Sequence, residues 1–188
     1  MEGPDFAIVY SAGISGAFLQ RGITTFREAA DYVGRLPYGR NADKTDLATV
    51  FSDGCGTCST KHALLKVLAN ENDFDGLKLM VGIFKMNHNN TPAVAGTLGK
   101  YGLDHIPEAH CYLRYNRGIF DHTFSNVQLD FVADLMEEQE IEPLQITDWK
   151  VAYHKAFINK WLAGDPQIVF SAVEIWAIRE QCIRDLSV

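Results

Sequence analysis

The feature that most constrains the fold is a glycine-containing turn that leads directly into an amphipathic helix. The turn reads Gly54-Cys55-Gly56-Thr57, and over residues 59–70 apolar positions recur every three or four residues. This spacing predicts a helix buried along one side, with Cys58 at its start. Because the first turn of a helix has unpaired N–H groups and a partial positive charge, a cysteine there ionises more readily than in bulk water. Cys58 is therefore a candidate nucleophile.

A second segment carries a histidine and an aspartate on two short predicted strands. Residues 109–115 and 118–123 flank a turn at Asn116-Arg117. The first strand holds His110 and the second holds Asp121. A thiol nucleophile needs a base, and the base needs a group that orients it, so the order cysteine, histidine, carboxylate makes a thiol triad plausible.

The register of this hairpin decides whether the histidine and the aspartate can meet. With a two-residue turn, Tyr115 pairs with Gly118. Tyr112 then lies opposite Asp121, and His110 lies diagonally from that carboxylate on the same face. A three-residue turn with a left-handed glycine would shift the pairing by one residue, and only a glycine bulge would restore the alignment. The prediction of a triad therefore assumes a two-residue turn.

Composition and length favour one folded domain. The 188 residues are 47% hydrophobic and 22% charged, which is typical of a globular chain with one good core. We expect an α+β domain over 1–188, with a core at about 25–125 and a helical extension at 126–188. The net charge of −7 argues against a nucleic-acid partner, because such proteins usually concentrate basic residues on one face.

The ends of the chain and its cysteines indicate a cytoplasmic protein without a membrane partner. The N-terminal residues 1–5 are acidic and contain a proline, unlike a secretory signal. The apolar run 168–178 is interrupted by Glu174 and is too short to span a bilayer. The four cysteines lack the paired clusters of a structural zinc site, so we expect free thiols, no metal and no cofactor.

Two further elements can be predicted on either side of the cysteine helix. Thr25 and Glu28 form the pattern of a capping box, which predicts a helix near 25–36. Pro37 favours the end of this helix, since proline disfavours helix in the residue before it. Residues 77–84 are rich in branched and aromatic side chains and predict a central strand.

The remaining chain divides into an irregular segment and a helical C-terminal part. Residues 87–102 contain several asparagines and glycines and are interpreted as a surface loop with one short helix, or else as a flap over a site. Amphipathic patterns predict helices over 127–138 and over 148–163. A last helix begins at Asp165-Pro166 or at Ser171.

Together these residues resemble the transglutaminase-like proteins, whose core is a variant of the papain-like fold. The first motif of that family, a Gly-x-Cys followed by an alanine five residues on, is present as Gly56-Thr57-Cys58 and Ala63. The second, a histidine on one strand and an Asp-x-Thr on the next, is present as His110 and Asp121-His122-Thr123. The resemblance covers about residues 50–125 and implies a nucleophile helix packed on an antiparallel sheet.

The resemblance also implies a mechanism. The Cys58 thiolate would attack the carbonyl of an amide or ester, His110 would carry the proton to the leaving group, and Asp121 would orient the imidazole. The acyl group would pass to water or to an amine, giving a hydrolase or a cross-linking transferase. The substrate would be a peptide or an amide-containing small molecule, while the oligomeric state is not indicated by the sequence.

The oxyanion of such a reaction would be met by the backbone N–H of Cys58 and by one further donor. Papain-like enzymes supply a glutamine six residues before the nucleophile, where this chain has Ser52. Asn41 and Tyr38, in the preceding polar turn, are the alternative candidates.

Three other functions compete with acyl transfer. Cys55 and Cys58 form a Cys-x-x-Cys pair at a helix start, as in thiol–disulfide oxidoreductases. The same two cysteines could bind a metal ion together with His62, with or without His110. The chain could also be an inactive descendant of the fold that serves as a binding module.

Several neighbouring residues have ordinary interpretations. Cys58 itself could be a small buried hydrophobe. His62 is expected to be hydrogen-bonded or to face solvent, and Lys61 to lie on the surface. Cys111 is interpreted as structural, and His122 as a packing or solvent-exposed residue.

Overall fold

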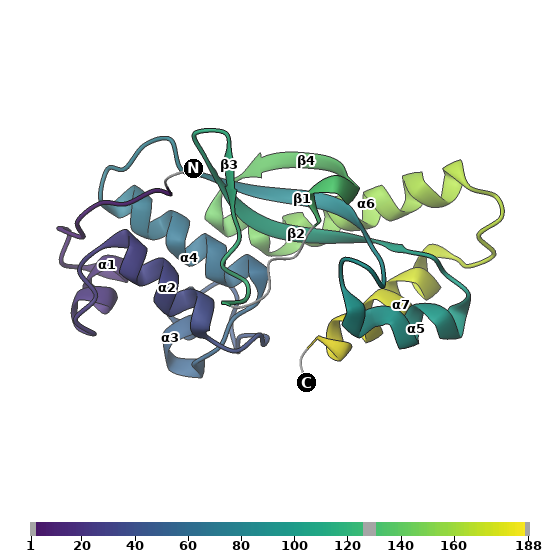
Figure 1. Ribbon diagram of the computed structural model, residues 1–188, viewed down its shortest axis with the longest axis horizontal. Coiled ribbons are helices and arrows are strands. Elements are labelled where there is room, and N and C mark those ends of the chain that lie inside the picture. The colour runs from purple at the N-terminus through teal and green to yellow at the C-terminus, as the bar shows by residue number, and fades with distance from the viewer. Residues whose placement is uncertain (1–2, 126–130, 187–188) are drawn as a thin grey trace. The chain divides into compact units, whose positions relative to one another are not determined.

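The computed structural model describes residues 3–125 and 131–186 and shows an α+β protein. Seven α-helices and a four-stranded antiparallel sheet in the order β3-β2-β1-β4 make up its described regular structure (Figure 1). This confirms the predicted α+β class. The helices are α1 (Gly13–Leu19), α2 (Phe26–Arg35), α3 (Thr49–Asp53), α4 (Cys58–Glu71), α5 (Ala95–Tyr101), α6 (Asp148–Gly164) and α7 (Ala172–Asp185). The strands are β1 (Lys78–Met86), β2 (Ile106–Tyr115), β3 (Gly118–Phe120) and β4 (Leu135–Ile141).

The chain forms two compact units. The first consists of Met1–Val81, Cys111–Gln128 and Gln139–Thr147, and the second of Gly82–His110, Leu129–Glu138 and Asp148–Val188. In the described part of the chain, no helix combines the length and the apolarity that a membrane crossing requires.

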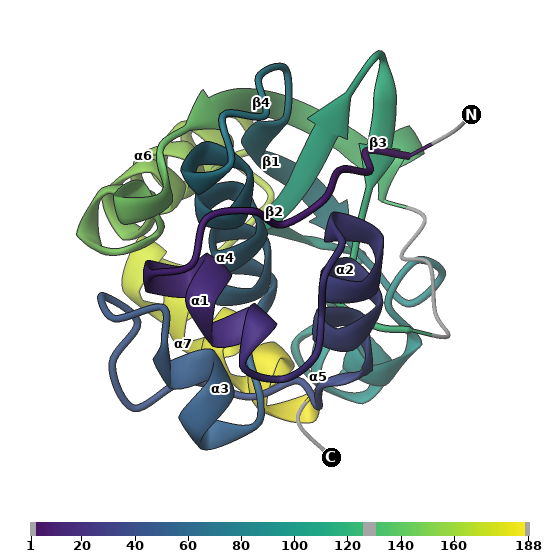
Figure 2. The same ribbon diagram turned by 90° about the vertical axis from the view of Figure 1, so that its left-hand side faces the viewer.

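Helix α4 is the centre of the first unit. Figure 2 shows α1, α2 and α3 grouped around it, and all three pack against it. As a result, every residue from Cys58 to Leu65 is buried. The predicted helix is confirmed, but burial along one side only was wrong. Polar side chains in these first two turns must therefore find partners inside the protein.

Helix α2 begins and ends where the sequence predicts. The Thr25 side chain accepts a hydrogen bond from Glu28 N, and the Glu28 carboxylate accepts one from Thr25 N. Leu36, the residue before Pro37, has an extended conformation with ψ of 140°. The helix therefore stops for the expected steric reason.

The β2–β3 hairpin has the two-residue turn on which the triad prediction depends. Tyr115 pairs with Gly118, and the ladder continues to Leu113 opposite Phe120. Asn116 and Arg117 both have positive φ, 46° and 71°, as a type I′ turn requires. The assumed register is confirmed from the Tyr115–Gly118 pair to the Leu113–Phe120 pair. Tyr112 and Asp121 lie just beyond this end of the ladder.

The second unit contains the irregular segment and the C-terminal helices. Helix α7 packs against α5 and α6 (Figure 1). Residues 87–102 contain a short 3₁₀ turn, Pro92–Val94, followed directly by α5. The segment thus contains the short helix that the interpretation as a surface loop expected. The last helix begins after Ser171, which caps it, rather than at Asp165-Pro166.

The predicted helix over 127–138 is wrong where the structure describes it. Residues 126–130 lie outside the described residues, Val132–Asp134 form a 3₁₀ turn, and β4 follows. The part after residue 125 is therefore not purely helical. Lys78 of β1 and Glu140 of β4 form an ion pair at 2.6 Å. The amphipathic pattern fitted a helix, but pairing with a distant strand decided the conformation, as tertiary context often does.

Candidate functional site

The candidate site begins at the N-terminus of α4, where Thr57 is the N-cap and Cys58 is the first helical residue. The Thr57 hydroxyl accepts from Thr60 N at 3.4 Å, and the Thr60 hydroxyl accepts from Thr57 N at 3.0 Å. This reciprocal capping fixes the first turn. Cys58 stands at the helix start that the sequence predicts, and it is 6% exposed.

The turn before Cys58 is held by the segment that follows α2. Gly56 N donates to Pro37 O at 3.1 Å, and Gly39 N donates to Gly56 O at 3.3 Å. A Cβ at Gly56 would stand 2.9 Å from Lys61 Cγ, so only glycine fits at this close approach. The turn before Cys58 therefore contacts the segment after α2 and the side chain of Lys61.

Asn41 belongs to this support. Its Oδ1 accepts from the Thr60 hydroxyl at 2.7 Å, while its Nδ2 donates to Cys55 O at 3.0 Å and to Asp53 Oδ2 at 3.3 Å. Both amide hydrogens thus bind the loop before the nucleophile. Asn41 would have to leave these acceptors to serve as an oxyanion donor.

The other two oxyanion candidates have different surroundings. The backbone of Tyr38 forms a bridge with Gly56, and its ring stacks on Phe124 with centroids 5.5 Å apart. Ser52 is exposed on α3, where its hydroxyl donates to Thr49 O at 3.3 Å. Tyr38 therefore adjoins the cysteine turn through its backbone, whereas the Ser52 hydroxyl bonds within its own helix.

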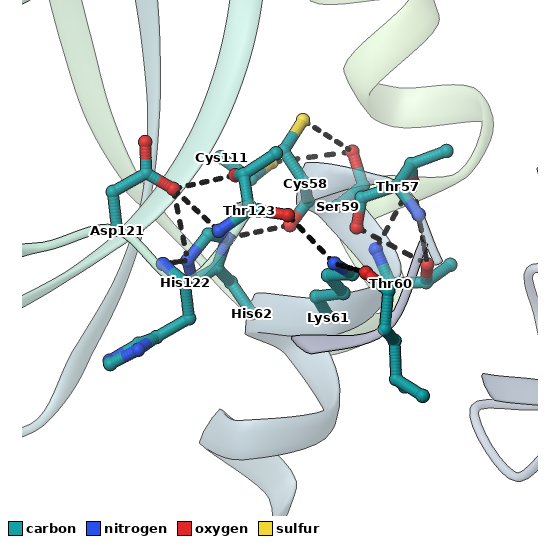
Figure 3. A network of polar contacts seen from close by, with 11 residues as sticks. Thr57, Cys58, Ser59, Thr60, Lys61, His62, Cys111, Asp121, His122 and Thr123 are labelled. Carbon is teal, nitrogen blue, oxygen red and sulfur yellow. Dashed lines mark hydrogen bonds and ion pairs between the residues drawn. The ribbon is translucent and has the colours of Figure 1, made fainter. Parts of the chain in front are cut away.

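His62 lies one turn after Cys58 and is fully buried. Its Nδ1 lies 2.7 Å from Cys58 O, and its Nε2 accepts from His122 N at 2.7 Å (Figure 3). Because Nε2 accepts, the ring proton must be on Nδ1, which donates to the carbonyl. Both nitrogens of this neutral imidazole are engaged with the backbone. His62 is thus the hydrogen-bonded neighbour that the sequence suggested, not a base.

Asp121 lies directly beyond β3 with a side chain that is 5% exposed. Its Oδ1 accepts from Thr123 N at 2.9 Å and from the Thr123 hydroxyl at 2.5 Å, which closes an Asx turn. The same oxygen lies 3.5 Å from His62 Nε2. The fold therefore brings this carboxylate to the first turns of α4.

Lys61 is a residue whose importance the sequence analysis missed. The expectation of a surface lysine was wrong, because its side chain is fully buried. Its Nζ donates to Leu36 O at 2.6 Å and to Thr123 O at 2.7 Å. Burial lowers the pKa of Lys61 to about 8, although the negative charge of Asp121 opposes this shift. A signal was available, since helical spacing places Lys61 on one stripe with Leu64, Leu65 and Leu68.

The other thiols have distinct environments. None of the four cysteines, all of them described, forms a disulfide, and Cys111 is completely buried and accepts from the Ser59 hydroxyl at 3.6 Å. This agrees with the structural interpretation of Cys111. Cys55 is half-buried. Over the described residues, no group of three or more histidines, cysteines and carboxylates is arranged to hold a metal ion.

His110, the proposed base, lies on β2 and is 4% exposed. Its ring packs edge-on against Phe84 and Phe131, with centroids 6.1 and 4.9 Å away. His110 belongs to the second compact unit, whereas Cys58 and Asp121 belong to the first. Its partnership with them therefore comes from the sequence pattern.

No family model, curated protein or solved structure matches this chain. The resemblance to the transglutaminase-like proteins accordingly stands on the motifs themselves. The function is argued below from the geometry of the site.

Proposed function

We propose that the protein is a cysteine-dependent acyl-transfer enzyme with Cys58 as nucleophile, His110 as base and Asp121 as the residue that orients the base. The observation that carries this proposal is the docking of the Asp121 turn against the first turns of the helix that Cys58 begins. A thiol at a helix start and a buried carboxylate brought to the same turns are two of the three parts of a thiol triad.

The position of Cys58 suits a thiolate. The N-terminal turn of α4 directs backbone N–H groups and the positive end of the helix dipole toward the first residue. Both effects favour the negative form of a cysteine. The same N–H groups can donate to an oxyanion, and one well-placed donor commonly contributes about 3 kcal/mol to transition-state stabilisation.

The hairpin supports the role of His110. Strand alternation puts His110 and Tyr112 on one face of β2, and extending the observed register by one residue past Leu113 and Phe120 would bring Tyr112 opposite Asp121. This is the diagonal relation from which the sequence pairs His110 with the carboxylate. His62 cannot take the same role, because both of its ring nitrogens bind backbone groups.

The proposed reaction has two steps. His110 accepts the proton of the Cys58 thiol while sulfur bonds to the substrate carbonyl carbon, and the tetrahedral intermediate collapses when His110 protonates the departing amine or alcohol. The resulting thioester is attacked by water or by an amine, whose proton passes to His110 and then to the leaving thiolate. The substrate is a peptide or another amide or ester.

The proposal is tested by alkylation of the protein with iodoacetamide across pH, with each modified cysteine identified by mass spectrometry. Cys58 should react selectively, with a midpoint well below the reference thiol pKa of about 8.5, and His110→Ala should abolish this selectivity. Slow and uniform alkylation of all four cysteines would contradict the proposal.

A matched pair of variants separates acyl transfer from thiol–disulfide exchange. Cys58→Ser should abolish hydrolysis of an activated ester and aminolysis by an added amine, while Cys55→Ser should retain both. An oxidoreductase that uses the Cys-x-x-Cys pair would instead lose insulin-reduction activity in both variants. Activity that persists in Cys58→Ser would rule out this nucleophile.

A further inference from the structure

We propose that Lys61 is a positioning residue of this site: its ammonium group holds the turn that carries Asp121 against α4, and its charge favours the Cys58 thiolate. The inference rests on the proposed function and adds a residue that the triad pattern does not include. The first evidence for this inference is the two hydrogen bonds that the Lys61 ammonium donates.

The Lys61 ammonium joins three segments of the first unit. It donates to Leu36 O at the end of α2 and to Thr123 O in the turn beyond β3, at 2.6 and 2.7 Å. These acceptors lie 25 and 62 residues away in the sequence. A fully buried ammonium is costly unless it is hydrogen-bonded, so both carbonyl acceptors must stay within its reach. It therefore defines where the turn can lie.

Two successive residues of α4 hold two successive residues of the turn. Lys61 binds Thr123 O, and His62 binds His122 N (Figure 3). Thr123 in turn donates its N–H and its hydroxyl to the Asp121 carboxylate. Loss of the lysine would remove one of these two anchors and would release the carboxylate from a defined position.

The charges that face Lys61 include the reactive groups. Burial lowers the pKa of Lys61, and the negative charges of Asp121 and of the ionised Cys58 and Cys55 oppose this shift. Burial likewise lowers the pKa of His122, and the Lys61 charge adds to that effect. From α2 the contact is the Leu36 carbonyl. Cys58 and Lys61 are three residues apart in the first turn of α4, which places them next to each other on the helix. Because electrostatic interactions are mutual, the ammonium also favours the thiolate form of Cys58.

The first test compares Lys61→Met with Lys66→Met, which makes the same change in the same helix at a half-buried position. The rate of Cys58 alkylation should fall about tenfold at pH 7 in Lys61→Met, because one opposite charge nearby shifts a pKa by about one unit or more. Lys66→Met should react like the wild type. Protection of Cys111 from the same reagent reports that each variant is folded.

Lys61→Gln separates the charge from the hydrogen bonds, because the amide can still donate but is neutral. It should show the same slower alkylation as Lys61→Met. Alkylation at the wild-type rate in either folded variant would overturn the inference. A wild-type Cys58 that reacts no faster than an ordinary thiol would instead overturn the proposed function, so the two failures are distinguishable.

A second measurement needs no variant. The Nζ signal of Lys61 can be followed by NMR across pH, before and after Cys58 is alkylated. Removal of the thiolate should lower the pH at which Lys61 loses its proton, since a negative neighbour is lost. An unchanged titration after alkylation would show that the two groups are not coupled and would overturn the charge role.

Discussion

The buried ion pair between Glu108 and Arg179 should be the main source of acid sensitivity in the second unit. Arg179 Nε and Nη2 donate to the two carboxylate oxygens of Glu108, both at 2.6 Å. The side chains are 8% and 12% exposed. Burial alone would raise the pKa of Glu108, but the guanidinium overrides it and lowers that pKa from 4.5 to about 2.

This shift sets the size and the direction of the effect. At about 1.4 kcal/mol per tenfold change in proton affinity, the pair contributes about 3 kcal/mol to the free energy of unfolding. The folded-state pKa is the lower one, so this contribution is complete above pH 4.5. It is lost as the pH falls through about 2. Glu108→Gln should therefore destabilise the protein by about 3 kcal/mol at pH 7, leaving a buried guanidinium without its counter-charge.

The assay is urea denaturation of the wild type and Glu108→Gln from pH 7 down to pH 2. The difference in unfolding free energy should be constant above pH 4.5 and should shrink below it. Glu140→Gln is the matched control, because the Lys78–Glu140 pair is about half exposed and should contribute less than about 1 kcal/mol. A difference that does not change with pH would refute the reasoning.

Three further predictions concern local geometry. Gly56→Ala should lower the melting temperature and slow the alkylation of Cys58. The new Cβ would stand 2.9 Å from Lys61 Cγ, and overpacking of this kind costs about 1–3 kcal/mol of unfolding free energy. An unchanged melting temperature would contradict this, because it would show that the Lys61 side chain can move aside. Arg117→Gly should stabilise the hairpin by up to about 1 kcal/mol in thermal denaturation, since φ of 71° is strained for a side chain; a loss of stability would contradict this. Ser171→Ala should cost about 1 kcal/mol of unfolding free energy, since it removes the cap of α7, and Ser171→Thr should retain most of it.

The amino-acid sequence was sufficient to predict those helix ends and turns whose hydrogen bonds join residues only a few positions apart. The Thr25–Glu28 capping box, the end of α2 before Pro37 and the start of α4 at Cys58 were all predictable, because each depends on neighbours along the chain. The two-residue turn at Asn116-Arg117 was correct for the same reason, although the sequence alone left a longer turn possible.

The tertiary structure alone decided the partners of the site. Lys61 was expected at the surface and is buried. Its helical spacing with Leu64 and Leu68 could have indicated burial, but its two acceptors lie 25 and 62 residues away and could not be predicted from its neighbours. The tautomer of His62 likewise depends on the backbone of His122, 60 residues away. Residues 135–138, predicted as part of a helix, instead belong to strand β4 because they pair within the sheet. Burial and long-range pairing depend on the whole chain, and helical or strand periodicity does not specify which distant group will be met.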